Sequence, residues 1–354
     1  MTSAFVLVDP HSSADLATQL VRTLPTDVVR IGLLGERGPA AEVFRASSHA
    51  VHRLPFRHAI DLGGLKQIRK AIAESKASVL HAVGPLAVRL SRGIPGPRLV
   101  VSAANVGSGL LRWLTERQTR TAQRVLAHSQ REAEDYRRQG VAGDRILDIP
   151  PATSSAKDAS EARDFRRSLD IPENARLIMT GGSLDRESGH RHAVWAFDGL
   201  KFGLTDLYLV IVGEGAERDR IEAFGKALGF DDYRIRYAGA RTDLPGLLHQ
   251  AAVVWVPQMR GGLSLTIDAM AVGRPVLACQ GSEAAELLRD GETGRLVPKG
   301  DPIALGMKTQ AILEDASLAE RLGAASLAAS KEYEPQRATD LLRQLYSSVG
   351  EPEA

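Results

Sequence analysis

The chain has 354 residues, of which 44% are hydrophobic and 25% are charged, and this composition is typical of a soluble globular protein with two domains. Lysine and arginine outnumber aspartate and glutamate by only 45 to 43, which excludes a strongly basic nucleic-acid-binding surface. The single cysteine, Cys279, excludes a disulfide framework and a cysteine-based metal site, and the sequence shows neither a basic leader nor a long apolar span, so we expect a cytoplasmic protein.

Short apolar runs rich in β-branched residues recur through the first half of the chain. They lie near residue 5 and at 28–34, 78–83, 98–103 and 124–129. Helical patterns separate most of them, and this alternation predicts a parallel sheet with helices on both faces. Ligands of such sheets bind where strands end, so His81 is a candidate catalytic residue at an acceptor site. The alternative is a structural histidine whose nitrogens are bonded within the core.

The segment 109–127, GLLRWLTERQTRTAQRVLA, combines leucines and a tryptophan with four arginines. A basic amphipathic segment of this kind can lie on an anionic membrane, and such contact would place the protein at the inner face of that membrane. The alternative is an ordinary helix that packs its apolar face on the sheet of the first domain.

The alternation of strands and helices breaks around 150–175, where PPATSSAKDASEAR supplies the prolines, serines and small polar residues of a connector. It resumes with the apolar runs ARLIMTGG, LYLVIVGEG, AVVWVP and RPVLAC. We therefore predict an α/β protein with two doubly wound domains. The predicted parts are a first domain at 1–151, a linker at 152–165, a second domain at 166–330 and a final helix at 331–354 that crosses back to the first domain.

A glycine-containing turn follows the predicted strand LYLVIV. Gly213 and Gly215 allow the backbone to approach a flat ligand closely, because neither residue has a Cβ. The alternative is a tight turn of the sort found in any α/β domain. Arg218 stands where a dinucleotide-binding GxGxxG motif has its third glycine, which counts against a nicotinamide cofactor.

The stretch 256–276, VPQMRGGLSLTIDAMAVGRPV, opens a helix behind two glycines. Residues Gly261, Gly262, Leu263 and Ser264 would present unpaired backbone amides there, and these amides together with the helix macrodipole attract phosphate. Asp268 follows one turn later. Its carboxylate would either accept hydrogen bonds from ribose hydroxyls or interact favourably with the helix dipole.

The stretch 239–302 resembles, nearly block by block, the nucleotide-sugar half of the glycosyltransferases of family 4. Weaker similarity lies at 126–151, at 180–197 and in the closing EYEPQRATDLLRQLY. The resemblance implies the GT-B fold, in which two Rossmann-like domains face a cleft. It also implies a retaining transfer of a sugar from a nucleoside diphosphate sugar to a glycan, lipid or small-molecule acceptor, with no metal and no cofactor beyond this donor substrate.

The resemblance also implies donor contacts. They are Gly213, Glu214, Gly215, Arg241 and Asp243 around the base, 261–264 at the diphosphate and Asp268 at the ribose. The chain departs from the family at four charged positions. The expected arginine and lysine of the loop that begins at Gly182 are Ser183 and Ser188, and the family's paired glutamates fall on Arg260 and Asp268.

The lost cations matter because negative charge grows on the diphosphate as the glycosidic bond breaks, and one missing electrostatic stabiliser costs roughly 2.7–4 kcal/mol. We hypothesise that Arg260 or Arg186 neutralises the diphosphate instead. The alternative is that both are solvated surface arginines. A rival function follows, a catalytically inactive family member that binds a nucleotide, a glycan or a partner protein. A sugar-nucleotide epimerase with the GT-B fold is a third interpretation.

Overall fold

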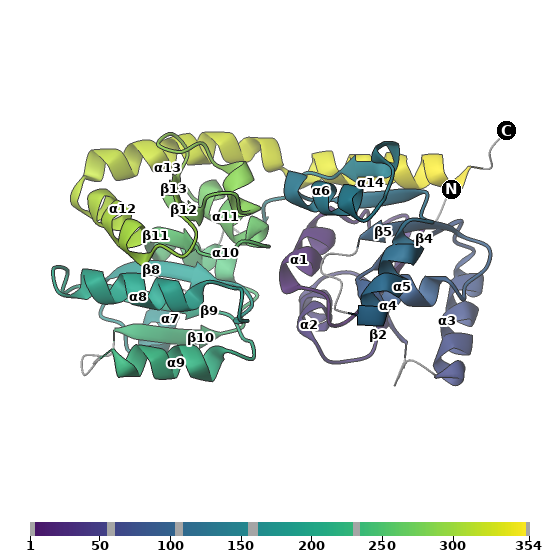
Figure 1. The fold of residues 1–354 in the computed structure, drawn as a ribbon, viewed down its shortest axis with the longest axis horizontal. Coiled ribbons are helices and arrows are strands. Elements are labelled where there is room, and N and C mark those ends of the chain that lie inside the picture. The colour runs from purple at the N-terminus through teal and green to yellow at the C-terminus, as the bar shows by residue number, and fades with distance from the viewer. Residues whose placement is uncertain (1–3, 55–60, 103–108, 155–161, 229–233, 352–354) are drawn as a thin grey trace. The chain divides into compact units, whose positions relative to one another are not determined.

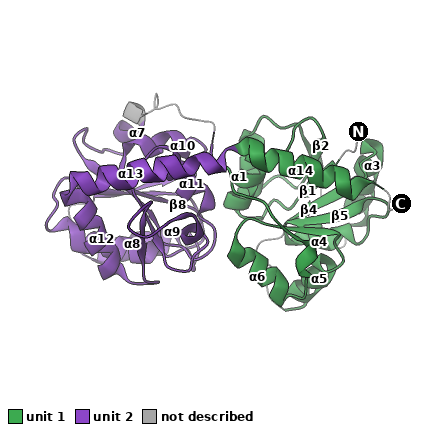
Figure 2. Ribbon diagram, turned by 90° about the horizontal axis from the view of Figure 1, so that it is seen from above, with its two compact units in different colours: residues 1–152, 335–354 green, residues 153–334 purple. Residues whose placement is uncertain are grey.

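The computed structural model describes residues 4–54, 61–102, 109–154, 162–228 and 234–351. The chain forms two compact units, which Figure 2 distinguishes by colour. The first unit comprises residues 1–152 and 335–354, and the second comprises 153–334. Part of the predicted linker, 155–161, lies outside the described residues.

The first unit is built on a seven-stranded sheet with the order β3-β2-β1-β4-β5-β6-β7. Every neighbouring pair of strands is parallel. The strands are β1 Ala4–Val8, β2 Val29–Leu34, β3 Val51–Leu54, β4 Val79–Val83, β5 Arg98–Ser102, β6 Arg124–Ala127 and β7 Ile146–Asp148. The strand order reverses between β1 and β4, which is where open parallel sheets form a ligand crevice at their carboxyl edge.

Helices cover both faces of this sheet (Figure 1). Side-chain caps define several helix starts, because Ser13, Asp61 and Ser129 each accept a hydrogen bond from a backbone amide three residues later. The helices are α1 Ala14–Thr23, α2 Pro39–Ala46, α3 Leu62–Ser75, α4 Pro85–Ser91, α5 Gly109–Thr119, α6 Gln130–Arg138, the 3-10 helix η1 Gly143–Arg145 and α14 Pro335–Gly350.

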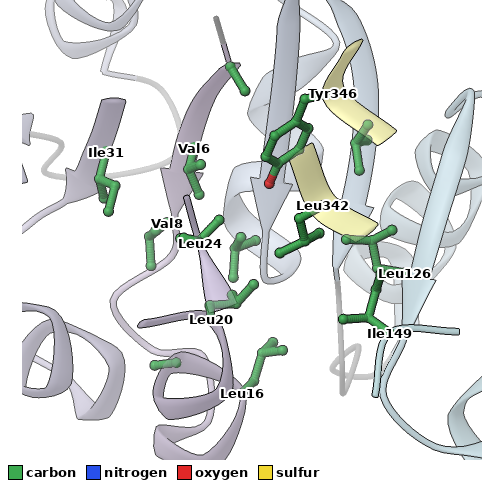
Figure 3. Close-up of a cluster of buried hydrophobic side chains, with 14 of the residues drawn as sticks. Val6, Val8, Leu16, Leu20, Leu24, Ile31, Leu126, Ile149, Leu342 and Tyr346 are labelled. Atoms are coloured by element: carbon green, nitrogen blue, oxygen red, sulfur yellow. The ribbon is translucent and has the colours of Figure 1, made fainter. Parts of the chain in front are cut away.

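Both faces of the first sheet are buried, which explains why its strands are apolar without interruption. Figure 3 shows one of the two cores, where Val6 and Val8 of β1 point toward Leu16 of α1 and toward Leu342 and Tyr346 of α14. The helix α14 therefore supplies part of the core of the first unit, although residues 153–334 separate it in sequence from the rest of that unit.

The second unit contains a six-stranded sheet with the order β10-β9-β8-β11-β12-β13, again with parallel neighbours. Its strands are β8 Arg176–Gly181, β9 Leu207–Val212, β10 Ile235–Gly239, β11 Ala251–Val256, β12 Val276–Cys279 and β13 Arg295–Val297. Trp255 is fully buried and donates from Nε1 to Thr309 Oγ1 at 2.8 Å, so a polar contact joins the sheet to the helix α12 Pro302–Glu314.

The helices of the second unit alternate with its strands. They are α7 Ala162–Ser168, α8 His190–Lys201, α9 Arg218–Ala227, α10 Leu244–Leu247, α11 Leu263–Ala271, α12 Pro302–Glu314 and α13 Ala316–Ser330, with the short 3-10 helices η2 Leu248–Gln250, η3 Ala284–Leu287 and η4 Lys331–Tyr333. The predicted α/β class with two doubly wound sheets is confirmed.

The basic amphipathic segment 109–127 is not a single helix. The helix α5 ends at Thr119, and the segment continues as the buried strand β6. The alternative, a helix that packs its apolar face on the sheet, is wrong for the start of α5: Leu110 is 71% exposed and Trp113 is 48% exposed, whereas Thr115 is buried. Within the described ranges, no helix has the length and hydropathy needed to cross a bilayer.

Candidate functional site

Two loops at the carboxyl edge of the second sheet pack closely on each other. A Cβ on Gly213, whose φ is 146°, would lie 1.9 Å from the carbonyl oxygen of Gly182, and a Cβ on Gly215 would lie 2.3 Å from that of Leu184. Both glycines are therefore required by the contact between the loops that follow β8 and β9. Their presence alone does not indicate a ligand.

The loop 182–189 carries the positions at which the family has its two cations. Ser183 and Arg186 are exposed. Ser188 is buried, and its hydroxyl donates to the carbonyl of Asp185 at 2.8 Å. The Ser188 side chain therefore forms a hydrogen bond within its own loop. Arg186 is a cation of the same loop, and its side chain is exposed to solvent.

The charged residues expected around a base have partners within the second unit. Glu214 forms an ion pair with Arg218. Arg241 donates from Nε to Asp243 Oδ1 at 2.8 Å, and its guanidinium lies 5.3 Å from the ring centroid of Phe165. The structure thus brings Arg241 and Asp243 together as a pair.

The head of α11 explains the two consecutive glycines. Gly261 has a φ of 71°, and Gly262, the N-cap residue, has a φ of 78°, so the chain passes through two left-handed residues between β11 and α11. A Cβ on Gly262 would lie 2.6 Å from Val256 Cγ1. Leu263 and Ser264 follow in the first turn, and both are buried.

The prediction of an unpaired amide at Gly261 is wrong. This amide donates to Glu283 Oε2 at 2.9 Å, and the other carboxylate oxygen of Glu283 lies 3.9 Å from the guanidinium of Arg260. The arginine is therefore already paired with an acid. Glu283 was missed in the sequence because it lies beyond β12, 22 residues after the glycine that it contacts.

Asp268 is 5% exposed, and its Oδ1 accepts a hydrogen bond at 2.9 Å from the backbone amide of Ser154. The carboxylate therefore anchors the first residues of the second unit to α11. One carboxylate oxygen of Asp268 thus has a structural role. A contact of Asp268 with a ribose remains a prediction.

Gln258 is a second residue that was missed in the sequence. Its side chain is 6% exposed, and Nε2 donates to the carbonyl of Gly181 at 3.2 Å. The same nitrogen lies 2.8 Å from the position of a Cβ on Gly262 and 3.2 Å from that of a Cβ on Gly182. The carboxamide thus lies between the loop after β8 and the head of α11. Its Oε1 is buried without a hydrogen-bond partner in the described part of the chain.

His81 lies in the core of the first unit, and the prediction that it acts on an acceptor is wrong. Its Nδ1 lies 2.8 Å from the Tyr346 hydroxyl and its Nε2 lies 2.9 Å from Ser102 Oγ. Burial, with a smaller contribution from the nearby imidazole of His128, lowers the pKa of His81 to about 3. With both ring nitrogens bonded and the ring fully buried, His81 is the structural histidine of the alternative interpretation.

A metal site was not expected. No group of three or more histidine, cysteine or acidic side chains with a suitable arrangement occurs among the residues that the structure describes. That the reaction needs no metal remains a prediction.

Comparisons with known proteins agree with this architecture. Residues 13–156 match the family described as Glycosyltransferase Family 4, and residues 161–328 match the family described as Glycosyl transferases group 1. A phosphatidyl-myo-inositol mannosyltransferase of Mycobacterium leprae is 33% identical over 44% of this chain and 41% of its own length. An alpha-D-kanosaminyltransferase of Streptomyces kanamyceticus is 26% identical over 68% of this chain and 64% of its own. The chain spans about half the length of the curated relatives it matches.

Solved structures share the fold. Anabaena HepE in complex with UDP-glucose superimposes with a TM-score of 0.83 at 18% identity, covering 98% of this chain and 100% of that one. A sucrose-phosphate synthase from Thermosynechococcus elongatus gives a TM-score of 0.75 at 19% identity, covering 98% and 99%. At these identities the likeness concerns the fold, and both sheets of the chain take part in it.

Proposed function

The chain belongs to the glycosyltransferases of family 4, and we propose that it transfers a sugar from a nucleoside diphosphate sugar to a glycan, lipid or small-molecule acceptor. The proposal includes retention of the anomeric configuration. Because Anabaena HepE was crystallised with UDP-glucose, uridine is the first base to test.

The observation that carries the proposal is the head of α11 with Gln258 beside it. Two left-handed glycines bring the backbone close to the loop after β8, and a helix begins directly behind them. Such a helix start favours a bound phosphate through its dipole. The buried Oε1 of Gln258 has no partner among the described residues, which supports a site that a polar ligand completes.

Two arginines near the head of α11 and the loop 182–189 can supply the cation at the diphosphate. Arg260 is already paired with Glu283, whereas Arg186 is exposed three residues after the position where the family has its arginine. We propose that Arg186 makes the larger contribution, with Arg260 in support. A charge-assisted hydrogen bond to phosphate contributes about 1.5–3 kcal/mol.

Calorimetric titration with UDP tests this assignment. We expect Arg186→Ala to weaken the affinity about tenfold and Arg260→Ala to weaken it less. Arg220→Ala is the matched control, since Arg220 is 78% exposed and pairs with Glu217 on the same helix start. Two variants that bind UDP as tightly as the wild type would contradict the proposed role of both arginines.

A catalytically inactive member of the family is the second candidate function. Two observations support it. Ser188, where the family has a lysine, forms a hydrogen bond within its own loop, and Arg260 is paired with Glu283. Among residues that the structure describes, few cations therefore lie near the leaving diphosphate. Hydrolysis of UDP-glucose, measured in parallel with thermal shift by UDP, separates the two candidates. Turnover favours a transferase, and stabilisation by UDP without turnover favours the inactive binder. Interconversion of the donor sugar without release of UDP would indicate an epimerase.

We also propose peripheral contact with anionic lipid through the start of α5. Leu110, Leu111 and Trp113 are exposed there, and Arg112 and Arg117 lie on the same short helix. Apolar side chains beside cations are the composition of an interfacial helix. Sedimentation with phosphatidylglycerol vesicles tests the contact. If the protein does not pellet with the vesicles at low salt, the proposed lipid contact is excluded.

A further inference from the structure

Two hydrogen-bond acceptors flank the head of α11. The Glu283 carboxylate is held by the amide of Gly261 at 2.9 Å and by the guanidinium of Arg260 at 3.9 Å, and its side chain is 12% exposed. On the other flank, the carboxamide of Gln258 abuts Gly262 and has a buried Oε1 without a partner in the described ranges.

These acceptors favour the hydroxyl groups of a nucleotide sugar and disfavour an additional anionic group on it. Hydroxyl groups donate hydrogen bonds, so a sugar beside the diphosphate can satisfy acceptor atoms. An additional anion finds no donor in Glu283 and is repelled by its charge. Two unit charges about 5 Å apart, in partly solvated surroundings, repel strongly enough to change an affinity about tenfold.

Glu283 repels an additional anion effectively because its carboxylate is held in place. A carboxylate on a mobile surface side chain would turn away from an incoming anion at little cost. Here a backbone amide holds Oε2, and Arg260 attracts Oε1, so displacement of the carboxylate would break both contacts.

We propose that Glu283, assisted by Gln258, makes the donor site select a neutral, hydroxyl-rich sugar and reject a sugar that carries a carboxylate or phosphate. This inference rests on the proposed function and specifies the class of donor for the same site. Glu283 is a specificity-determining residue in this proposal, and Arg260 is a positioning residue that orients it.

Calorimetric titrations with UDP, UDP-glucose and UDP-glucuronate test the proposal. UDP-glucuronate carries a carboxylate in place of the C6 hydroxymethyl group of UDP-glucose, so the ratio of the two dissociation constants reports discrimination against that carboxylate. The change of this ratio in Glu283→Gln reports the part that is due to the Glu283 charge. We expect the wild type to prefer UDP-glucose about tenfold, and Glu283→Gln to reduce the preference to about threefold or less. Gln258→Met should weaken the binding of UDP-glucose more than it weakens the binding of UDP.

Glu292→Gln is the matched control, because it removes the same charge from a residue that is 60% exposed and paired with Arg289 on the surface. It should keep the wild-type ratio. Thermal unfolding of each variant verifies the fold, and a variant that retains UDP binding is folded at the site.

Each other outcome overturns the selection. Equal affinity of the wild type for both sugar nucleotides contradicts it, as does an unchanged ratio in Glu283→Gln. If Glu283→Gln tightens UDP, UDP-glucose and UDP-glucuronate by one common factor, then Glu283 only competes with the diphosphate for the Gly261 amide. A wild type that binds none of the three contradicts the proposed function itself, which separates that failure from a failure of the selection.

Discussion

The buried imidazole of His81 should make the first unit sensitive to mild acid. The folded unit holds the neutral ring, whose pKa is lowered from the ordinary value of 6.5 to about 3 by burial. Unfolding returns the ring to water, where it takes up a proton below pH 6.5. The free energy of unfolding is therefore unaffected by His81 above about pH 6.5, and it decreases as the pH falls from there toward 3.

The expected magnitude follows from the width of this window. Between the two pKa values the unfolded state binds one more proton than the folded state, which corresponds to about 1.4 kcal/mol for each pH unit. Lowering the pH from 6.5 to 5 should therefore remove about 2 kcal/mol from the stability of the first unit. This is a large fraction of the 5–15 kcal/mol typical of a domain.

Urea titrations at pH 7, 6 and 5, read by pulse deuterium labelling of peptides that contain β4, measure the free energy for the first unit alone. His190, whose pKa burial lowers to about 4, acts in the same direction in the second unit, so the readout must be local. His81→Gln provides the comparison, because glutamine is uncharged at every pH tested. The variant should lose about 1.4 kcal/mol less per pH unit than the wild type, and parallel slopes would refute the reasoning.

Three further results are expected. Tyr346→Phe, which removes the hydroxyl 2.8 Å from His81 Nδ1, should destabilise the first unit by about 1–3 kcal/mol in urea titration, and an unchanged midpoint would show that the contact contributes nothing. Gly213→Ala should destabilise the second unit and weaken UDP binding, because its Cβ would lie 1.9 Å from the carbonyl of Gly182; a variant with wild-type stability and affinity would contradict this contact. Trp113→Ser should reduce vesicle pelleting without changing UDP affinity, and equal pelleting would place lipid contact elsewhere.

The sequence was sufficient to predict what repeats or is local. Alternating strands and helices predicted both sheets, and the glycine pair predicted the turn into α11, because glycine adopts a left-handed backbone without steric cost. Contacts between distant residues were not predictable. Glu283 reaches Gly261 across 22 residues, and Tyr346 reaches His81 across 265, and neither pairing has a local pattern. The sequence therefore predicted the turn into α11 better than it predicted which charged residues surround that turn.

The contribution of α14 to the core of the first unit has a consequence for synthesis. A ribosome releases the β1 residues Val6 and Val8 early, but their partners Leu342 and Tyr346 emerge only after the whole of 153–334. Until then α1 and α2 cover that face of the nascent amino-terminal sheet but α14 does not, and apolar side chains left exposed in this way invite chaperones or aggregation. The carboxy-terminal unit has all of its own core residues sooner, so the part of the protein made first is the part completed last.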